Sequence, residues 1–140
     1  KSKKAAGNFD FIHSTDSLKL AQSLSQEAKE KNIIQKVLIQ VNISKEETKY
    51  GYDKEQLKEE IRTINELDSI DIKGLMTIAP YTTDKKLLRT IFRELREFRD
   101  NLEEEFNLSL PELSMGMSND YKIAVQEGST IIRLGSAIFR

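Results

Sequence analysis

The chain has 140 residues, which is enough for one domain or for part of a larger one. Its 22 Lys and Arg residues nearly balance its 23 Asp and Glu residues, and it has no cysteine and a single histidine. This composition excludes disulfides, thiolate chemistry and a histidine metal cluster, and charge gives no reason to expect binding to nucleic acid or to an anionic membrane. No apolar run approaches the roughly 20 residues of a membrane span. No signal peptide opens the chain, so we expect a soluble, cytoplasmic protein.

Strand and helix patterns alternate along the first half of the chain. A strand candidate at 9–14 precedes a helix that Asp16 or Ser17 caps, in which apolar residues recur at intervals of three and four. The clearest strand, 36–43, is nearly continuous in apolar residues, as parallel strands covered on both faces are. The polar segment 44–52 follows it, and loops at the end of a strand often carry function.

The alternation continues in the second half. Asp53 opens a helix, a third strand spans 70–78, and Asp84 begins the longest helix. The charged residues of the longest helix are expected to form a solvated outer face. Its expected core face consists of Leu87, Leu88, Ile91, Phe92, Leu95, Phe98 and Leu102.

The last thirty residues predict a strand, a turn, a helix, a turn and a final strand. The first strand is expected at 113–117, and any of the residues 118–120 can cap a two-turn helix over 121–127. Gly128 is a typical helix stop, and the β-branched and apolar run 130–139 predicts the last strand.

Five strands alternating with four helices predict an α/β fold with a parallel sheet and right-handed crossovers. The Gly and Ser turns follow the last two strands and not the first, which favours a (β/α)₈ TIM-type barrel over a doubly wound sheet. A typical barrel needs about 250 residues. We therefore expect one partial domain, 1–140, which supplies the last five strands and lacks three βα units. Its open edges would then allow it to self-associate.

Two turns in this final stretch carry small residues beside backbone amides: 116–118 and the pair Gly135-Ser136. Small residues let a phosphate approach the main chain, and a helix N-terminus favours negative charge. The placement matches the phosphate site that barrels form after their last two strands. Alternatively, Gly116 and Gly135 relieve crowding where strands meet helices.

Arg133 lies among apolar residues and shares a strand face with Ile131 and Gly135. If that face points into a barrel, its guanidinium needs an acceptor, because buried charges are paired. The acceptor is either a carboxylate of the protein or a ligand.

The residues of the C-terminal motif resemble those of the pyridoxal phosphate homeostasis protein family. The similarity lies in Leu-Ser-Met-Gly-Met-Ser-Asn-Asp at 113–120 and Gly-Ser-Thr-Ile-Ile-Arg-Leu-Gly-Ser at 128–136. It extends upstream to 12–17, 40–52 and 74–78, so it covers the chain from end to end. These cofactor-binding proteins are related in fold to the barrel domain of alanine racemase.

The resemblance implies that pyridoxal 5′-phosphate binds in the barrel mouth. Arg133 would face the pyridine nitrogen and keep it unprotonated, since two positive charges in contact are costly. The residues that the resemblance assigns to the phosphate are Met117, Ser118, Gly135 and Ser136. Further candidates for binding the cofactor, with lower priority, lie at strand ends facing the same mouth: His13, Asn42, Met76 and Ser114.

The resemblance also implies that the lysine that bonds the cofactor covalently belongs to a segment outside this chain. Lys36, Lys49 and Lys73 are interpreted as ordinary surface lysines. A covalent bond is therefore not expected from this chain alone, whose site would be empty or hold phosphate or sulfate.

The expected function is that of an intracellular carrier or regulator of pyridoxal phosphate without robust catalytic activity. The full-length protein that contains this chain is expected to be monomeric. Its expected partner is pyridoxal phosphate. Binding to nucleic acid or to a membrane is not expected. Two alternatives remain open: the barrel portion of an alanine-racemase-like enzyme, and a phosphate-binding barrel that takes no pyridoxal.

Overall fold

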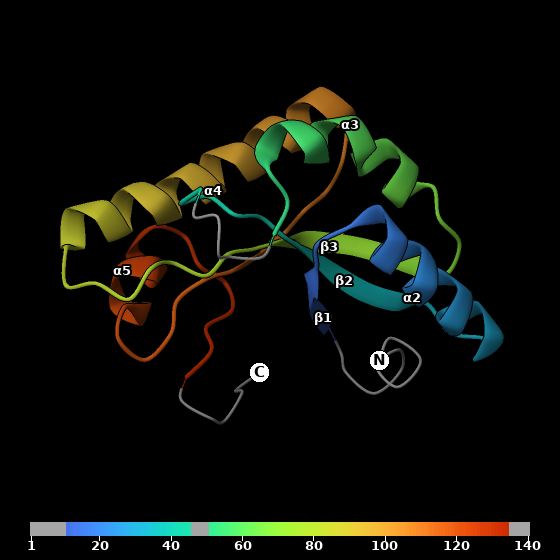
Figure 1. Cartoon of the computed structure of the whole chain (residues 1–140), viewed down its shortest axis with the longest axis horizontal. Helices are drawn as coiled ribbons and strands as arrows, with labels where there is room; N and C mark the ends of the chain where they lie inside the picture. The colour runs from blue at the N-terminus through green and yellow to red at the C-terminus, as the bar shows by residue number, and fades with distance from the viewer. Residues whose placement is uncertain (1–10, 46–50, 135–140) are drawn as a thin grey trace.

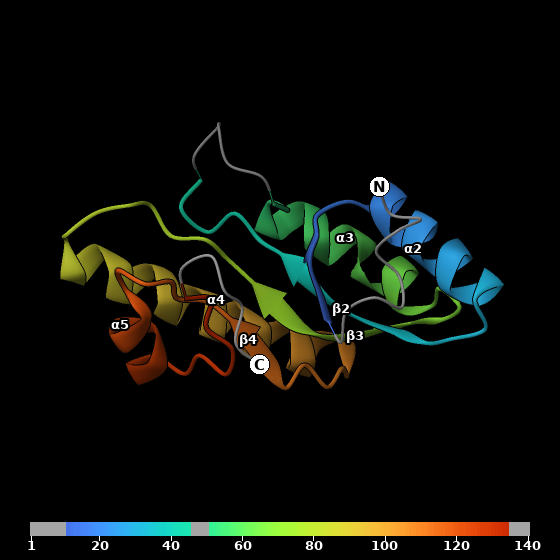
Figure 2. The ribbon, with the colours of Figure 1, turned by 90° about the horizontal axis from the view of Figure 1, so that it is seen from below.

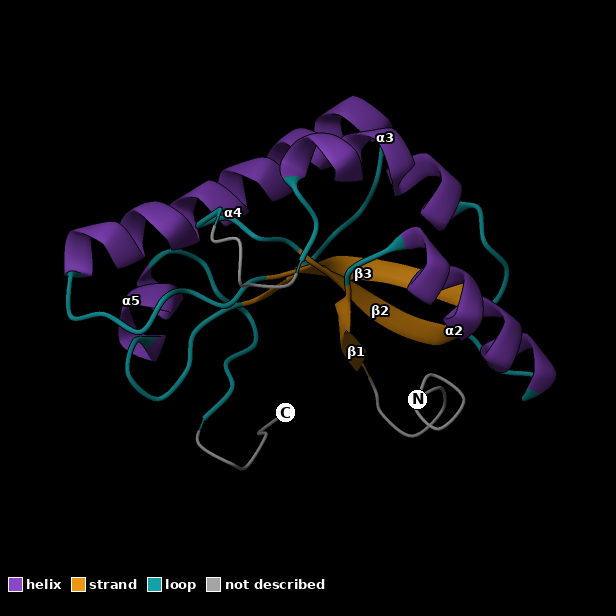
Figure 3. Ribbon diagram, in the orientation of Figure 1, coloured by secondary structure: helices purple, strands orange, loops and turns teal. Residues whose placement is uncertain are grey.

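The computed structural model describes residues 11–45 and 51–134, which form a parallel sheet with helices packed on it (Figures 1 and 3). The sheet has the order β1-β2-β3-β4, so each strand pairs with the next strand of the chain. The strands are β1 Phe11–Thr15, β2 Gln35–Gln40, β3 Ile70–Met76 and β4 Glu112–Ser114. The helices are α2 Leu18–Glu30, α3 Lys54–Asn65, α4 Lys85–Phe106 and α5 Tyr121–Gln126. The predicted α/β class and parallel pairing are confirmed, and each of the four predicted helices is present in the described residues.

The helices begin where the capping residues predict. Ser17 Oγ accepts a hydrogen bond of 3.1 Å from the amide of Leu20 at the start of α2. Asp84 Oδ1 accepts one of the same length from the amide of Leu87 at the start of α4. Each bond satisfies an amide that has no partner inside its helix.

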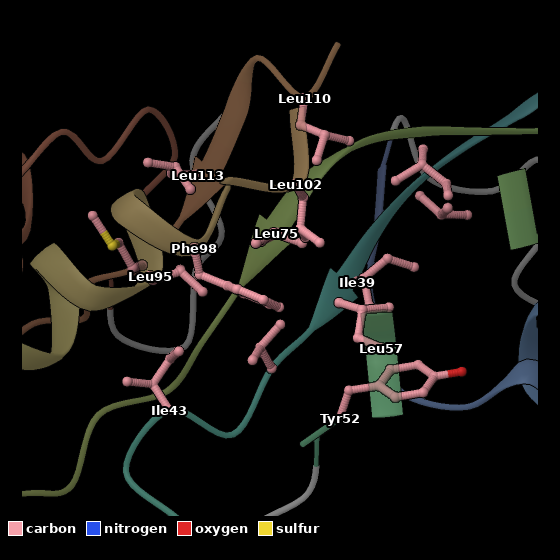
Figure 4. Packing of buried hydrophobic residues seen from close by; sticks show 14 of the residues in the cluster. Ile39, Ile43, Tyr52, Leu57, Leu75, Leu95, Phe98, Leu102, Leu110 and Leu113 are labelled. Atoms are coloured by element: carbon pink, nitrogen blue, oxygen red, sulfur yellow. The ribbon is translucent and has the colours of Figure 1, made fainter. Parts of the chain in front are cut away.

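The core lies between the sheet and the helices α2, α3 and α4, which cover one side of the sheet (Figures 1 and 4). Ile39, Leu75 and Leu113 pair in register across β2, β3 and β4, and all three are fully buried in this core. Phe98 of α4 and Leu57 of α3 lie in the same cluster. Because successive strand side chains alternate between faces, the neighbours of these three residues point to the opposite face of the sheet.

Strands β2, β3 and β4 end earlier than predicted, whereas β1 runs to Thr15, one residue past its predicted end. Beyond β2 and β4, other segments take the next hydrogen bonds. Strand β2 stops at Gln40, whose carbonyl accepts from the amide of Tyr52, while the Tyr52 carbonyl accepts from Asn42. Strand β3 stops at Met76 and not at residue 78. Strand β4 stops at Ser114, and Met115 donates to the carbonyl of Ile131.

The predicted fifth strand is present in the described residues only as a bridge. Ile131 pairs in parallel with Ser114, while 135–139 lie outside the described residues. The start of the first predicted strand (9–10) and most of the polar loop (46–50, with Lys49) also lie outside them.

The predicted core face and the predicted outer face of α4 each need a correction. Leu87, expected in the core, is 41% exposed. Arg93 and Arg96, expected in solvent, contact the buried carboxylate of Glu127. Leu87 and Arg93 lie in the N-terminal half of α4 and Arg96 lies at its middle, and α5 lies beside this part of the helix (Figure 2).

The hydroxyl of Thr15 offers a test of the packing. Among the described residues its Oγ1 is a buried oxygen without a hydrogen-bond partner. Burying such a hydroxyl costs free energy, so Thr15→Val is expected to raise the free energy of unfolding by about 1 kcal/mol in chemical denaturation. Thr77→Val is the matched control, because the buried Thr77 Oγ1 donates to the Val41 carbonyl at 2.7 Å. That control should be destabilised, and a destabilised Thr15→Val would contradict the prediction.

Within the described residues, no helix is both long enough and apolar enough to cross a membrane.

Candidate functional site

A row of side chains crosses the sheet face opposite the core, at the C-terminal ends of the strands. Gln40 pairs with Met76, and Met76 pairs with Ser114. All three are more than nine-tenths buried. Ligands of open parallel sheets bind at this end of the strands. The row therefore marks the edge at which a site is expected.

Ser114 lies at the centre of the polar contacts on this row. Its Oγ accepts a hydrogen bond of 2.5 Å from Arg133 Nη1 and lies 2.9 Å from His13 Nδ1. Because Ser114 Oγ accepts from Arg133, its own proton is available to donate to His13 Nδ1. This bond requires the histidine tautomer that carries its proton on Nε2. Residues 13, 114 and 133, which are far apart in the sequence, thus meet at one hydroxyl.

Arg133 is also bonded to the end of β3. Its Nη2 donates to the carbonyl of Thr77 at 3.0 Å, and its backbone amide donates to the carbonyl of Gly116 at 2.9 Å. The Thr77 amide donates in turn to the carbonyl of Ser114. The guanidinium is therefore held in one orientation by two neighbouring strand ends.

The acceptors of Arg133 are neutral oxygens. Burial lowers the pKa of its guanidinium, and the carboxylate of Asp120 acts in the opposite direction. An arginine stays protonated at neutral pH, so the site keeps a partly buried positive charge. Of the two alternatives left open by the sequence, a direct ion pair is absent among the described residues. The positive charge of Arg133 is therefore suited to contact a ligand.

The turn after β4 has a defined hydrogen-bond pattern. Asp120 Oδ1 accepts from the Met117 amide at 2.7 Å, and the Met117 carbonyl accepts from the amides of Asp120 and Tyr121. These bonds close the turn, while the Asp120 side chain makes no cap bond to the amides of α5. The Met117 amide, predicted to hold phosphate, is thus bonded to Asp120 in this structure. Ser118 directly follows it at the first turn leading into α5.

Gly116 supports the alternative that its small size relieves crowding. Its φ of +103° lies in the region that favours glycine, and a Cβ there would lie 2.7 Å from Ala124 Cβ. The glycine thus allows both the sharp turn after β4 and the close approach of α5.

A cavity of about 550 Å³ lies between the first turns of α4 and α5. Its basic residues are Lys85, Arg89 and Lys122, and its acidic residue is Asp120. Ser118 also lines it, whereas Ser114 and Arg133 do not. The cavity and the Arg133 cluster therefore meet only through the turn that carries Ser118 and Asp120.

The structure brings together four of the predicted residues: His13, Met76, Ser114 and Arg133. Asn42 is bonded within its own loop. Its backbone amide donates to the Tyr52 carbonyl, and its side-chain Oδ1 accepts from Ser44 Oγ at 3.4 Å. Gly135 and Ser136 lie outside the described residues. Two residues were missed: Thr77 and Asp120. No side-chain signal marks Thr77, because it meets Arg133 through its backbone carbonyl, and Asp120 was interpreted only as a helix cap.

The two predicted surface lysines that the structure describes lie away from the strand ends. Lys73 Nζ is 3.1 Å from Asp71 Oδ2, and Lys36 Nζ is 5.8 Å from the centre of the Phe11 ring. Each lies N-terminal, on its own strand, to the row formed by Gln40, Met76 and Ser114. Lys49 lies outside the described residues.

Comparison with known proteins identifies relatives along the whole chain. The family model described as alanine racemase, N-terminal domain, matches residues 2–140. A pyridoxal phosphate homeostasis protein from Aquifex aeolicus is 46% identical over 99% of this chain and 61% of that protein. One from Synechocystis sp. is 38% identical over 99% of this chain and 64% of that protein. The chain thus spans about three-fifths of the length of these relatives.

Solved structures agree with these matches. PipY of Synechococcus elongatus without PLP has a TM-score of 0.91 at 39% identity, covering 97% of this chain and 64% of that one. PipY with PLP bound has a TM-score of 0.88 at 39% identity, covering 97% and 63%. An alanine racemase of Clostridium difficile has a TM-score of 0.67 at 19% identity, covering 90% and 32%, which shows a shared fold alone. The resemblance predicted from the C-terminal motif is confirmed.

Proposed function

Because this chain belongs to the alanine racemase N-terminal domain family, we propose that it is part of a barrel that binds pyridoxal 5′-phosphate and serves as a carrier or regulator of that cofactor. The observation that carries the proposal is the meeting of His13, Ser114 and Arg133 at the strand ends. The names of its relatives and the PLP-bound structure of PipY support the same ligand.

The residues present fit this cofactor, which has an anionic phosphate and an aromatic nitrogen. The partly buried guanidinium of Arg133 has neutral acceptors only, so it has charge to offer an anionic ligand and a donor to offer a ring nitrogen. Ser118 stands at the turn into α5, where a hydroxyl and helix-start amides suit a phosphate.

Each residue has a distinct part in the proposed site. Ser118, with Gly135 and Ser136, would hold the phosphate. Arg133 would face the ring nitrogen, and Ser114 and Thr77 would orient its guanidinium through the bonds of 2.5 and 3.0 Å. The fixed positive charge keeps a proton off the ring nitrogen.

When bound, pyridoxal phosphate supplies a carbonyl group that amines can attack and a ring that withdraws electrons. A ring nitrogen kept unprotonated withdraws them less strongly, which suits racemase-like chemistry or storage of the cofactor better than transamination. We propose storage without robust catalytic activity, because the relatives of this chain are named pyridoxal phosphate homeostasis proteins. The likeness to alanine racemases concerns the fold, so it adds no argument for racemisation.

The arrangement of the rest of the protein belongs to the same proposal. We propose that the domain 1–140 supplies the later strands of a (β/α)₈ barrel, and that a preceding segment carries the covalent lysine. The four parallel strands in sequential order, with α2, α3 and α4 on one face, support this. The cytoplasmic location, the monomeric parent and the absence of nucleic-acid and membrane partners remain predictions.

The test is a titration with pyridoxal phosphate of this chain and of the full-length protein that contains it, with absorbance spectra before and after borohydride. We expect a reduction-stable adduct in the full-length protein, and weak binding without such an adduct in this chain. A stoichiometric adduct on this chain would show that one of its own lysines is the anchor. No binding by the full-length protein would contradict the proposed function.

A further inference from the structure

Glu127, which directly follows α5, is a buried carboxylate contacted by three arginines of α4. Its side chain is 8% exposed. Arg93 Nε lies 3.2 Å from Glu127 Oε1, Arg89 Nη1 lies 3.4 Å from Oε2, and Arg96 Nη1 lies 3.5 Å from Oε1. The arginines recur at intervals of four and three, so they form one ridge along α4. One carboxylate thus meets a row of three cations.

Ionic contacts of Glu127 join the end of α5 to α4 beside a small apolar contact. Helix α5 has six residues, of which only Ile123 and Ala124 are buried, so its apolar contact is small. Arg96 Nη1 adds a hydrogen bond of 2.7 Å to the Glu127 carbonyl. Breaking a buried ion pair by removing one partner costs more than an exposed pair contributes, because charge is left uncompensated.

The same contact is connected to the turn that carries Ser118. Arg89 contacts Glu127 and also lines the cavity beside Ser118 and Asp120. Beyond Glu127, Ser129 Oγ donates to the carbonyl of Met115 at 2.7 Å. Glu127 and Ser129 both follow α5, and because this helix has only six residues, less than two helical turns separate these contacts from the 116–120 turn.

We propose that Glu127 is a positioning residue for the phosphate of pyridoxal phosphate: by holding α5 on the Arg89–Arg93–Arg96 ridge, it sets the position of the 116–120 turn. This inference rests on the proposed function. It assigns Glu127 no contact with the ligand, and it predicts an effect on the phosphate end of the cofactor alone.

The acid dependence of this contact has a defined sign. Hydrogen bonding from Arg93 lowers the pKa of Glu127 below its usual value near 4.5, burial acts against this, and Arg96 and Arg89 add to the lowering. Glu97 is a further charge beside Arg93. A lowered pKa in the folded state means that the stabilisation is present above the unfolded pKa and is lost as the pH falls through the folded pKa. The difference in Tm between the wild type and Glu127→Gln should therefore be largest at neutral pH and shrink below about pH 4.5.

The experiment compares the affinities of the full-length protein for pyridoxal phosphate and for pyridoxal, which lacks the phosphate. Glu127→Gln is expected to weaken binding of pyridoxal phosphate by about tenfold, equivalent to about 1.4 kcal/mol, and to change binding of pyridoxal by less than about twofold. Glu105→Gln is the matched control, because Glu105 lies 3.6 Å from Lys58 in a more exposed ion pair and should leave both affinities unchanged. Glu127→Asp keeps the charge and is expected to restore part of the affinity for pyridoxal phosphate.

Equal losses for the two ligands would overturn the inference, since they would show a general structural role. Unchanged binding of pyridoxal phosphate by a folded Glu127→Gln variant would also overturn it. If Glu127→Gln does not fold, Arg93→Gln, which removes one of the three arginines, takes its place with the same two criteria. A wild-type protein that binds no pyridoxal phosphate overturns the proposed function and this inference together, whereas the other outcomes leave the proposed function standing.

Discussion

Replacing Arg133 with alanine is expected to weaken binding of pyridoxal phosphate by roughly 10- to 100-fold in the full-length protein. The guanidinium is a partly buried cation with neutral acceptors, and hydrogen bonds that involve a charged group contribute about 1.5–3 kcal/mol. Its removal also leaves Ser114 Oγ and the Thr77 carbonyl without this donor. Titration followed by absorbance measures the loss. Because the ring nitrogen would lose its cationic neighbour, the spectrum of the bound cofactor should change as well.

Arg99→Ala is the control for this substitution. Like Arg133, Arg99 is a largely buried arginine, but it belongs to α4. Its Nη1 donates to the carbonyl of Leu110 at 2.9 Å, away from the strand ends. Its loss should lower stability and leave the affinity for pyridoxal phosphate unchanged. Equal losses of affinity for both variants would contradict the role assigned to Arg133.

Replacing Gly74 with alanine is expected to destabilise the fold by about 3 kcal/mol, the upper end of the usual cost of overpacking. Gly74 pairs with Glu112 across β3 and β4, and an added Cβ would overlap the backbone carbonyl of Glu112. The overlapping atom belongs to a paired strand and cannot move without breaking the pairing. Guanidinium-induced unfolding measures the shift, with an unchanged slope indicating an unchanged unfolding reaction.

Gly128→Ala provides the comparison at a second glycine. Its φ of +105° disfavours alanine, but an added Cβ would lie 3.1 Å from the flexible side chain of Arg96 and not against backbone. Its expected cost is about 1–2 kcal/mol. A Gly74→Ala variant no less stable than Gly128→Ala would contradict the close approach of β3 and β4.

The candidate site was partly predictable from the sequence. Arg133 stood out because it interrupts an apolar run, and Ser114 stood out at the end of a short strand. Thr77 was missed because it acts through its backbone carbonyl, which every residue has. Asp120 was interpreted as a cap for α5; it holds the N-cap position, but its carboxylate makes no cap bond and accepts instead from the Met117 amide. The roles of Gly135 and Ser136 stay predictions.

The sequence by itself determined the order of the elements and their starting points. Ser17 and Asp84 cap their helices through bonds to amides three residues away, and such contacts depend only on local spacing. The apolar stripe of α4 from Leu88 to Leu102 is likewise a local pattern, and it is buried as predicted. The alternation of strands and helices followed from the same short-range signals, and with it the parallel sheet.

Only the tertiary structure decided where the strands end and which charges are buried. Strand β2 stops where Tyr52 takes its hydrogen bonds, and Glu127 is buried against Arg93, whose own side chain stays 52% exposed. Ser114 becomes the meeting point of His13 and Arg133 only when the fold brings a side chain of β1 and the 131–133 segment to the end of β4. A hydrogen bond or an ion pair needs two partners within about 3–4 Å, and for residues 19 to 101 positions apart that distance is set by the packing of the whole sheet.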